Sequence, residues 1–204
     1  SDVCSSDLGW IVSVWVALAF PDLPKVVLLP LCVILGALAG AMAAAIPGLL
    51  RAFFGTSEVI VTIMMNYILL YLSTFALHDV MPESYRSSLD SSNLVGQNAS
   101  LRVPWLTQMF GGSRVNAGLF LALIALFLVW LLMKKTTLGF EVRSVGLNPF
   151  ASEYAGMSSK RTIVLSMVIS GALAGLGGVV EGLGTYQNFF VQTTSLSIGF
   201  DGMA

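Results

Sequence analysis

The sequence predicts an all-α protein, a bundle of helices that crosses a membrane several times. The 204-residue chain is 56% hydrophobic and only 10% charged, whereas an ordinary soluble domain has about 25% charged residues. Four apolar runs are each 18 to 21 residues long, which is the length that a transmembrane helix needs. They lack the polar face of a helix in a soluble bundle. The runs cover residues 26–46, 59–77, 116–133 and 163–180.

The two ends of the chain are interpreted separately. Residues 9–20 are apolar but would reach only about 18 Å as a helix, so we expect them to be the remaining end of a longer one. Residues 1–8, SDVCSSDL, resemble the translation of a sequencing-library adapter, and we expect them to be non-native. The alternative is a genuine short polar N-terminus. We expect residues 9–204 to be part of a longer domain, truncated at both ends.

Few residues in this chain could carry chemistry. Without residues 1–8 the one cysteine is Cys32, inside an apolar run, where a cysteine usually behaves as a small hydrophobic residue. The one histidine, His78, lies at a helix end. One cysteine and one histidine cannot supply a disulfide, a metal site or a catalytic constellation. We therefore expect neither an enzyme nor a metal or cofactor, and we see no patch that would bind nucleic acid.

The basic residues predict the orientation of the spans. Alternating the spans places residues 47–58 and 134–162 on one side of the membrane, and residues 21–25 and 78–115 on the other. Six basic residues lie on the first side and four on the second. Four of the six lie directly at helix ends: Lys134, Lys135, Lys160 and Arg161. The positive-inside rule therefore predicts that residues 134–162 are cytoplasmic.

Residues 134–162 are interpreted as a basic loop that carries one short helix. Asn148 can cap the free amides and Pro149 fits the first helical position, while Gly156 is a natural stop. A helix of about seven residues is unstable alone in water, so the membrane domain or a docked protein must hold it. Arg143 could fix the loop against helix ends or reach an acidic partner. Three side chains are larger and more apolar than a solvated loop needs: Phe150, Tyr154 and Met157. The alternative is a helix lying on lipid head groups.

The apolar helix that follows is rich in small residues at a spacing of four. Gly171, Gly175 and Gly178 belong to this pattern, and Gly36 and Gly40 repeat it in an earlier span. Small residues four apart let helix backbones approach closely in lipid. We expect these glycines to form a compact core that can shift by small sliding motions.

Three segments together resemble a known family. In order they are SEVIVTIMMNYILLYL at 57–72, LGFEVRSVGLNPFASEYAGMSSKR at 138–161 and LSMVISGALAGLGGVVEGLGT at 165–185. They resemble the permease subunits of bacterial ABC importers, in the group that contains ribose, branched-chain amino acid and nucleoside permeases. The resemblance covers the chain from about residue 47 to its end, and it is nearest to the nucleoside (guanosine-type) branch.

The resemblance implies a coupling helix in the region 146–156, which would insert into a cleft of an ATPase subunit. ATP-driven closure would push this helix, and the glycine-rich helix behind it would transmit the displacement. The residues that carry the motif are Arg143, Gly146, Asn148, Tyr154 and Gly156. The implied partners are ABC ATPase subunits that hydrolyse the ATP, a second permease subunit (identical or different), an extracellular substrate-binding lipoprotein or periplasmic protein, and membrane lipid. The implied location is the bacterial inner membrane.

Polar residues within the spans are candidates for the transport path, because burying them in lipid is costly. Asn66 and Tyr67 could hydrogen-bond to and stack on a nucleobase or sugar. Glu181 and Asn188 could line the outer mouth. The alternatives are an interhelical hydrogen bond for Asn66 and an interfacial charge for Glu181.

The sequence therefore predicts a permease that imports a nucleoside with energy from a separate ATPase. One alternative is a member of the same family that imports a simple sugar such as ribose, or branched-chain amino acids. A different class is an ATP-independent channel or a secondary transporter. No Asp, Glu, Lys or Arg lies near the centre of a full span, which argues against coupling to protons or sodium, whereas a passive pore stays physically possible.

Overall fold

The computed structural model describes residues 2–88, 91–96, 99–101, 108 and 117–190. Most of this part of the chain is helical, and its strands form one short antiparallel hairpin. Four helices are long and apolar enough to cross a membrane: Lys25–Phe54, Val59–Val80, Gly118–Lys135 and Ser159–Tyr186. Each overlaps one of the four predicted spans, so the predicted fold class, a polytopic helical bundle, is confirmed.

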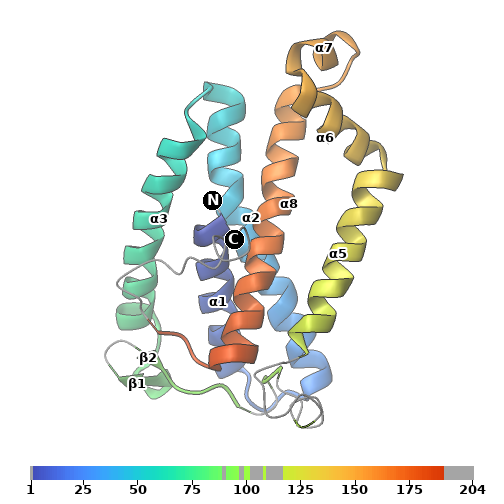
Figure 1. The fold of residues 1–204 in the computed structure, drawn as a ribbon. Helices are drawn as coiled ribbons and strands as arrows, with labels where there is room; N and C mark the ends of the chain where they lie inside the picture. The colour runs from blue at the N-terminus through green and yellow to red at the C-terminus, as the bar shows by residue number, and fades with distance from the viewer. Residues whose placement is uncertain (1, 89–90, 97–98, 102–107, 109–116, 191–204) are drawn as a thin grey trace.

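Three helices form the centre of the bundle: α1 (Asp2–Ala19), α2 (Lys25–Phe54) and α8 (Ser159–Val180). Each packs along the other two. Helix α3 (Glu58–Phe75) packs on α1. Helix α5 (Gly118–Lys135) stands on the opposite side of the centre (Figure 1). The outer helices therefore flank a tight three-helix core.

The connections lie at two ends of the bundle. Figure 1 shows the α2–α3 link, α6 (Thr137–Leu147) and α7 (Pro149–Tyr154) at one end, and the hairpin at the other. The hairpin pairs β1 (Arg86–Ser88) with β2 (Ser91–Ser92), with Arg86 opposite Ser92. Single π-helical turns extend α3 to Val80 and α8 to Tyr186. The residues expected on one side of the membrane thus lie at one end of the molecule.

Glycines bring the central helices to backbone contact. A Cβ added at Gly171 would lie 2.6 Å from the carbonyl oxygen of Gly40, and one at Gly175 would lie 2.6 Å from that of Gly36. A Cβ at Gly178 would overlap the backbone of α1. These separations are well below an ordinary carbon–oxygen contact of about 3.3 Å, so a side chain at these positions would force the helices apart.

Two helices are longer than the sequence predicts. The predicted span 26–46 ends before Pro47, but α2 continues through that proline to Phe54. Membrane helices tolerate proline because neighbouring groups satisfy the backbone, so the expected connection 47–58 is much shorter. Helix α1 begins at Asp2, which makes residues 2–8 its first turns. The interpretation of residues 1–8 as adapter-derived stays a prediction. Cys32 is fully buried, as expected for a small hydrophobic side chain.

Candidate functional site

The segment between α5 and α8 is more ordered than the expected loop with one short helix. Residues 137–147 form a second helix, α6, whose first turn is capped by Thr136. The Thr136 hydroxyl donates to the carbonyl oxygen of Leu132 (2.6 Å) and accepts from the amide of Gly139 (3.3 Å). One side chain therefore ends α5 and starts α6. The expectation of a loop here is wrong.

Arg143 on α6 bonds back to the end of α5. Its Nε donates to the carbonyl oxygen of Gly139 (3.2 Å), and its Nη2 donates to that of Met133 in the last turn of α5. Gly139 makes this contact possible, because a Cβ there would lie 2.5 Å from the Met133 carbonyl oxygen. Of the two roles weighed for Arg143, the structure shows the contact with a helix end. Together these bonds make a braced elbow between α5 and α6.

Helix α7 has the start and stop that the sequence predicts. The Asn148 side chain accepts from the amides of Phe150 (3.1 Å) and Ala151 (3.2 Å), and Pro149 is the first helical residue. Gly156, at φ +84°, ends the segment in a conformation that favours glycine. The Ser159 hydroxyl donates to the Pro149 carbonyl oxygen (3.0 Å), which fastens α7 to the start of α8.

Large apolar side chains are exposed on α7 and at the end of α6. Leu147, Phe150 and Tyr154 are 89%, 76% and 96% exposed, and we call these three side chains the α7 surface. Basic residues lie at the adjoining helix ends: Lys134 and Lys135 at the end of α5, and Lys160 and Arg161 at the start of α8. Exposed large apolar side chains gathered in this way are typical of an interaction site. The region is built to contact a lipid surface or another protein.

The five predicted coupling residues lie together on α6, α7 and the turn that follows, but they face different neighbours. Arg143 contacts α5 and Asn148 caps α7, so both hold the local structure. Tyr154 projects outward, and a Cβ at Gly146 would meet nothing within 4 Å. Tyr154 and the surface around Gly146 are therefore the members of this set that are open to contact, and a role in coupling stays a prediction.

The predicted transport-path residues do not converge in the described part of the chain. Asn66 is partly buried against α1, where its Oδ1 accepts from the Cys4 thiol (3.8 Å). Tyr67 is 63% exposed. Glu181 and Asn188 follow α8, while α3 lies on the far side of α1 from α5 (Figure 1). The structure therefore separates Asn66 and Tyr67 from the other two residues, and a shared role in binding stays a prediction.

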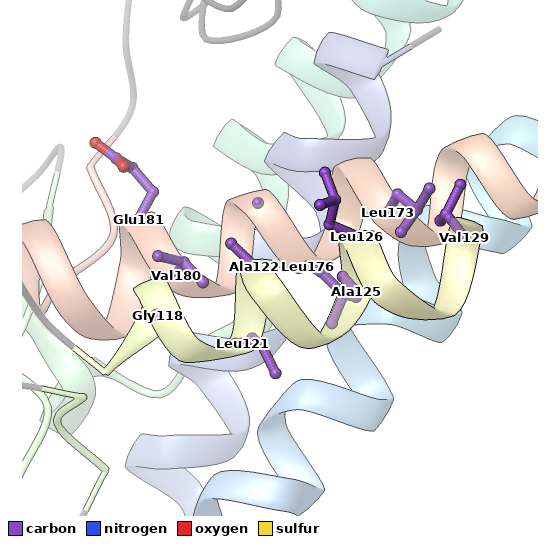
Figure 2. A pocket seen from close by; sticks show the side chains of 11 residues that line it. Gly118, Leu121, Ala122, Ala125, Leu126, Val129, Leu173, Leu176, Val180 and Glu181 are labelled. Carbon is purple, nitrogen blue, oxygen red and sulfur yellow. The ribbon is translucent and has the colours of Figure 1, made fainter. Parts of the chain in front are cut away.

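Glu181 stands at one end of an apolar groove between α5 and α8 (Figure 2). Its Oε2 accepts from the Thr185 hydroxyl (3.3 Å). Most of the groove is lined by leucine, valine, alanine and glycine. Sequence reasoning missed this groove, since no local pattern reports the distance between two helices.

Sequence reasoning also missed an aromatic cluster at the end of the core that lies near the hairpin. Trp10 is 2% exposed, and its indole stacks on Tyr186 with ring centroids 5.5 Å apart. Phe189 and Phe190 meet the indole edge-on. The indole Nε1 donates to the backbone carbonyl of Asn188 (2.9 Å). The one signal was a tryptophan in the apolar residues 9–20, and its partners lie more than 170 residues away.

The four membrane-length helices define a polytopic membrane protein, and comparison with known proteins defines its family. The family described as branched-chain amino acid transport system / permease component matches residues 7–204. The chain is 54% identical to the nucleoside ABC transporter permease protein NupB of Lactococcus lactis, over 96% of this chain and 54% of that protein. It is 45% identical to the guanosine ABC transporter permease protein NupP of Bacillus subtilis, over 97% and 55% respectively.

A more distant relative is the glucose ABC transporter permease protein TsgB13 of Haloferax volcanii, at 33% identity over 89% of this chain and 49% of that protein. No solved structure matches the chain. The chain belongs to the family of ABC permease components. It spans about half the length of the curated relatives that it matches.

Proposed function

We propose that this chain is part of the membrane-spanning permease of an ATP-driven importer, and that the cargo is a nucleoside delivered by an extracellular binding protein. The observation that carries the proposal is the α7 surface, three exposed apolar side chains on the capped helix α7 and the end of α6, at one end of the bundle. A helix of six residues is too short to be stable alone. Here Asn148 and Ser159 brace it, so it can present these side chains to an ATPase subunit.

The basic helix ends around this surface support a cytoplasmic location for it. Lys134 and Lys135 end α5, and Lys160 and Arg161 begin α8, so four positive charges flank α7 at one end of the bundle. The positive-inside rule assigns such an end to the cytoplasm, where ATP is available. The importer would then lie in the bacterial inner membrane, with a second permease subunit beside it and ATPase subunits beneath it.

The names of two relatives support a nucleoside as cargo, because NupB and NupP are described as nucleoside and guanosine permeases. A simple sugar is the second candidate, since TsgB13 is described as a glucose permease. Asn66, Tyr67, Glu181 and Asn188 are the candidate cargo contacts. Because the described helices do not enclose them in one cavity, the path would be completed by further permease helices or by the second subunit.

Transport by the parent permease tests the proposal. The parent permease, its ATPase and its binding protein are reconstituted in liposomes, and uptake of labelled guanosine is measured with and without ATP. We expect uptake that depends on ATP and on the ATPase. Uptake without the ATPase would overturn the importer, and uptake of ribose or branched-chain amino acids without guanosine would overturn the nucleoside assignment.

A pair of charge substitutions tests the α7 surface. Tyr154→Asp should abolish co-purification with the ATPase without unfolding the permease, because the side chain is almost fully exposed. Leu94→Asp is the matched control, since Leu94 is 69% exposed in the segment after the hairpin strand β2, at the opposite end of the bundle. Equal retention of the ATPase by both variants would show that α7 is not the contact.

A further inference from the structure

The groove between α5 and α8 is long enough to follow most of a membrane span. It borders α5 from Gly118 to Leu132. At 1.5 Å per residue this is about 21 Å, two-thirds of a hydrocarbon core of roughly 30 Å. Its larger part has a volume of about 550 Å³. Figure 2 shows Ala125 and Val129 of α5 beside Leu173 and Leu176 of α8 along its length.

The width of the groove is set by contacts at both ends of α5. At one end the elbow holds α5 through Thr136 and Arg143, and α6 stands between α5 and α8. At the other end the Ala117 amide donates to the Leu101 carbonyl oxygen (3.0 Å). The Leu101 amide donates in turn to the carbonyl of Leu183, just beyond α8 (3.1 Å). These contacts and hydrogen bonds at the two ends of α5 therefore keep α5 apart from α8.

The walls of the groove resemble helix-packing surfaces. Small residues recur on both sides, with Gly118, Ala122 and Ala125 on α5 and Ala172 and Gly177 on α8. In lipid, helices associate through small residues that let backbones approach. A Cβ added at Gly177 would meet nothing within 4 Å, whereas its neighbour Gly178 packs against α1. The face of α8 that carries Gly178 is thus packed against α1, and the adjoining face that carries Gly177 is not packed against another helix.

We propose that this groove seats one face of a further transmembrane helix, supplied by the part of the permease polypeptide that lies outside this chain. The inference rests on the proposed function in one respect, that the parent is a longer permease. The chain spans only 54% and 55% of NupB and NupP, so those relatives have enough additional sequence for several spans. The occupant is apolar along most of its length, since Glu181 is the single charged residue among the described residues that line the groove.

Oxygen accessibility of spin labels tests the occupant. A cysteine at Ala125 faces the groove, and a cysteine at Leu123, which lines no part of it and is 56% exposed, is the matched control. Cys4 and Cys32 are first replaced, and each label is measured in bilayers in the 204-residue chain and in the parent permease. We expect the Ala125 label to lose its access to oxygen in the parent, while the Leu123 label keeps it.

Three results would overturn the proposal. Equal oxygen access of the Ala125 label in the 204-residue chain and in the parent permease would mean that lipid fills the groove. Protection that already occurs in the 204-residue chain and disappears on dilution with lipid would mean that a second copy fills it. A shorter distance between labels at Ala125 and Leu173 in the parent would mean that α5 closes onto α8. None of these readouts depends on ATP or cargo, so they separate this proposal from the importer itself.

Gly177 gives a second test that does not use labels. In the 204-residue chain Gly177→Leu projects into open space, so we expect resistance to unfolding by detergent that is unchanged or slightly higher. In the parent permease the same leucine would collide with the seated helix, and we expect a loss of stability that is smaller for Gly177→Ala. Full stability of Gly177→Leu in the parent would contradict a packed helix at this position.

Discussion

Replacing Gly175 by alanine should destabilise the three-helix core by an amount that the structure bounds. A Cβ at this position would lie 2.6 Å from the carbonyl oxygen of Gly36 and 3.2 Å from the Cα of Gly40. An ordinary carbon–oxygen contact is about 3.3 Å, so α2 and α8 must separate by roughly 0.7 Å. The obstructing atoms belong to backbone and cannot rotate away.

The expected cost follows from two opposing effects. Overpacking a core costs about 1–3 kcal/mol, and the rigid backbone on both sides places Gly175→Ala at the upper end. Alanine returns up to about 1 kcal/mol through its better helix propensity. The net loss is about 2 kcal/mol, which lowers the folding equilibrium constant by about 30-fold.

Unfolding of the purified chain by sodium dodecyl sulfate, followed by tryptophan fluorescence, measures this loss. Gly177→Ala is the matched control two residues away, where the new Cβ would meet no neighbouring helix within 4 Å. In the 204-residue chain it should be neutral or stabilise by about 0.5–1 kcal/mol through propensity alone. If Gly175→Ala proved as stable as Gly177→Ala, the close approach of α2 and α8 would be refuted.

Three further substitutions test other parts of the structure. Asn148→Ala removes both cap bonds and should destabilise α7 by about 1 kcal/mol. Amide hydrogen exchange in α7 should therefore be faster in Asn148→Ala than in Asn148→Asp, and equal exchange rates in the two variants would contradict the cap. Tyr154→Ala should weaken binding to the ATPase and leave detergent resistance unchanged, because the side chain is 96% exposed, so lost resistance with intact binding would count against the docking role. Trp10→Ala should lower the stability of the core by about 3–5 kcal/mol. Trp10→Phe should lower it by about 1 kcal/mol, because it removes the hydrogen bond to Asn188. Equal losses of stability in detergent unfolding would show that the buried ring area does not stabilise the core.

The features that could be predicted from sequence depend on local signals. The length of an apolar run predicts a transmembrane helix, and all four runs correspond to membrane-length helices. The ends of α7 are set by Asn148, Pro149 and Gly156, whose preferences act within a few residues. One boundary was wrong, because the predicted span 26–46 stops before Pro47 and α2 continues through that proline to Phe54.

The features that could not be predicted depend on contacts between distant residues. Residues 137–147 contain two glycines and several branched side chains, so propensity favours a loop there. Thr136, through its cap, and Arg143, through its bond to the Met133 carbonyl, hold them as a helix. The glycine pattern predicted close packing but could not name Gly36, Gly40 and α1 as the partners. The groove is a distance between α5 and α8, which no sequence pattern records.

A displacement of α7 could be passed on by two routes, into α8 or into α5, and these two helices differ in how tightly they are packed. One passes through Ser159 into α8, whose glycines are in backbone contact with α1 and α2, so α8 can shift only with the core. The other passes through α6 into α5, which packs mainly on α6 and borders the groove. The sequence interpretation assigned the transmission of a push on α7 to the glycine-rich helix. Because Thr136 and Arg143 join α5 to α6, we expect a push on α7 that reaches α6 to move α5 with it, within the limits set by the contacts of α6 with α8 and by the bond from Ala117 to Leu101.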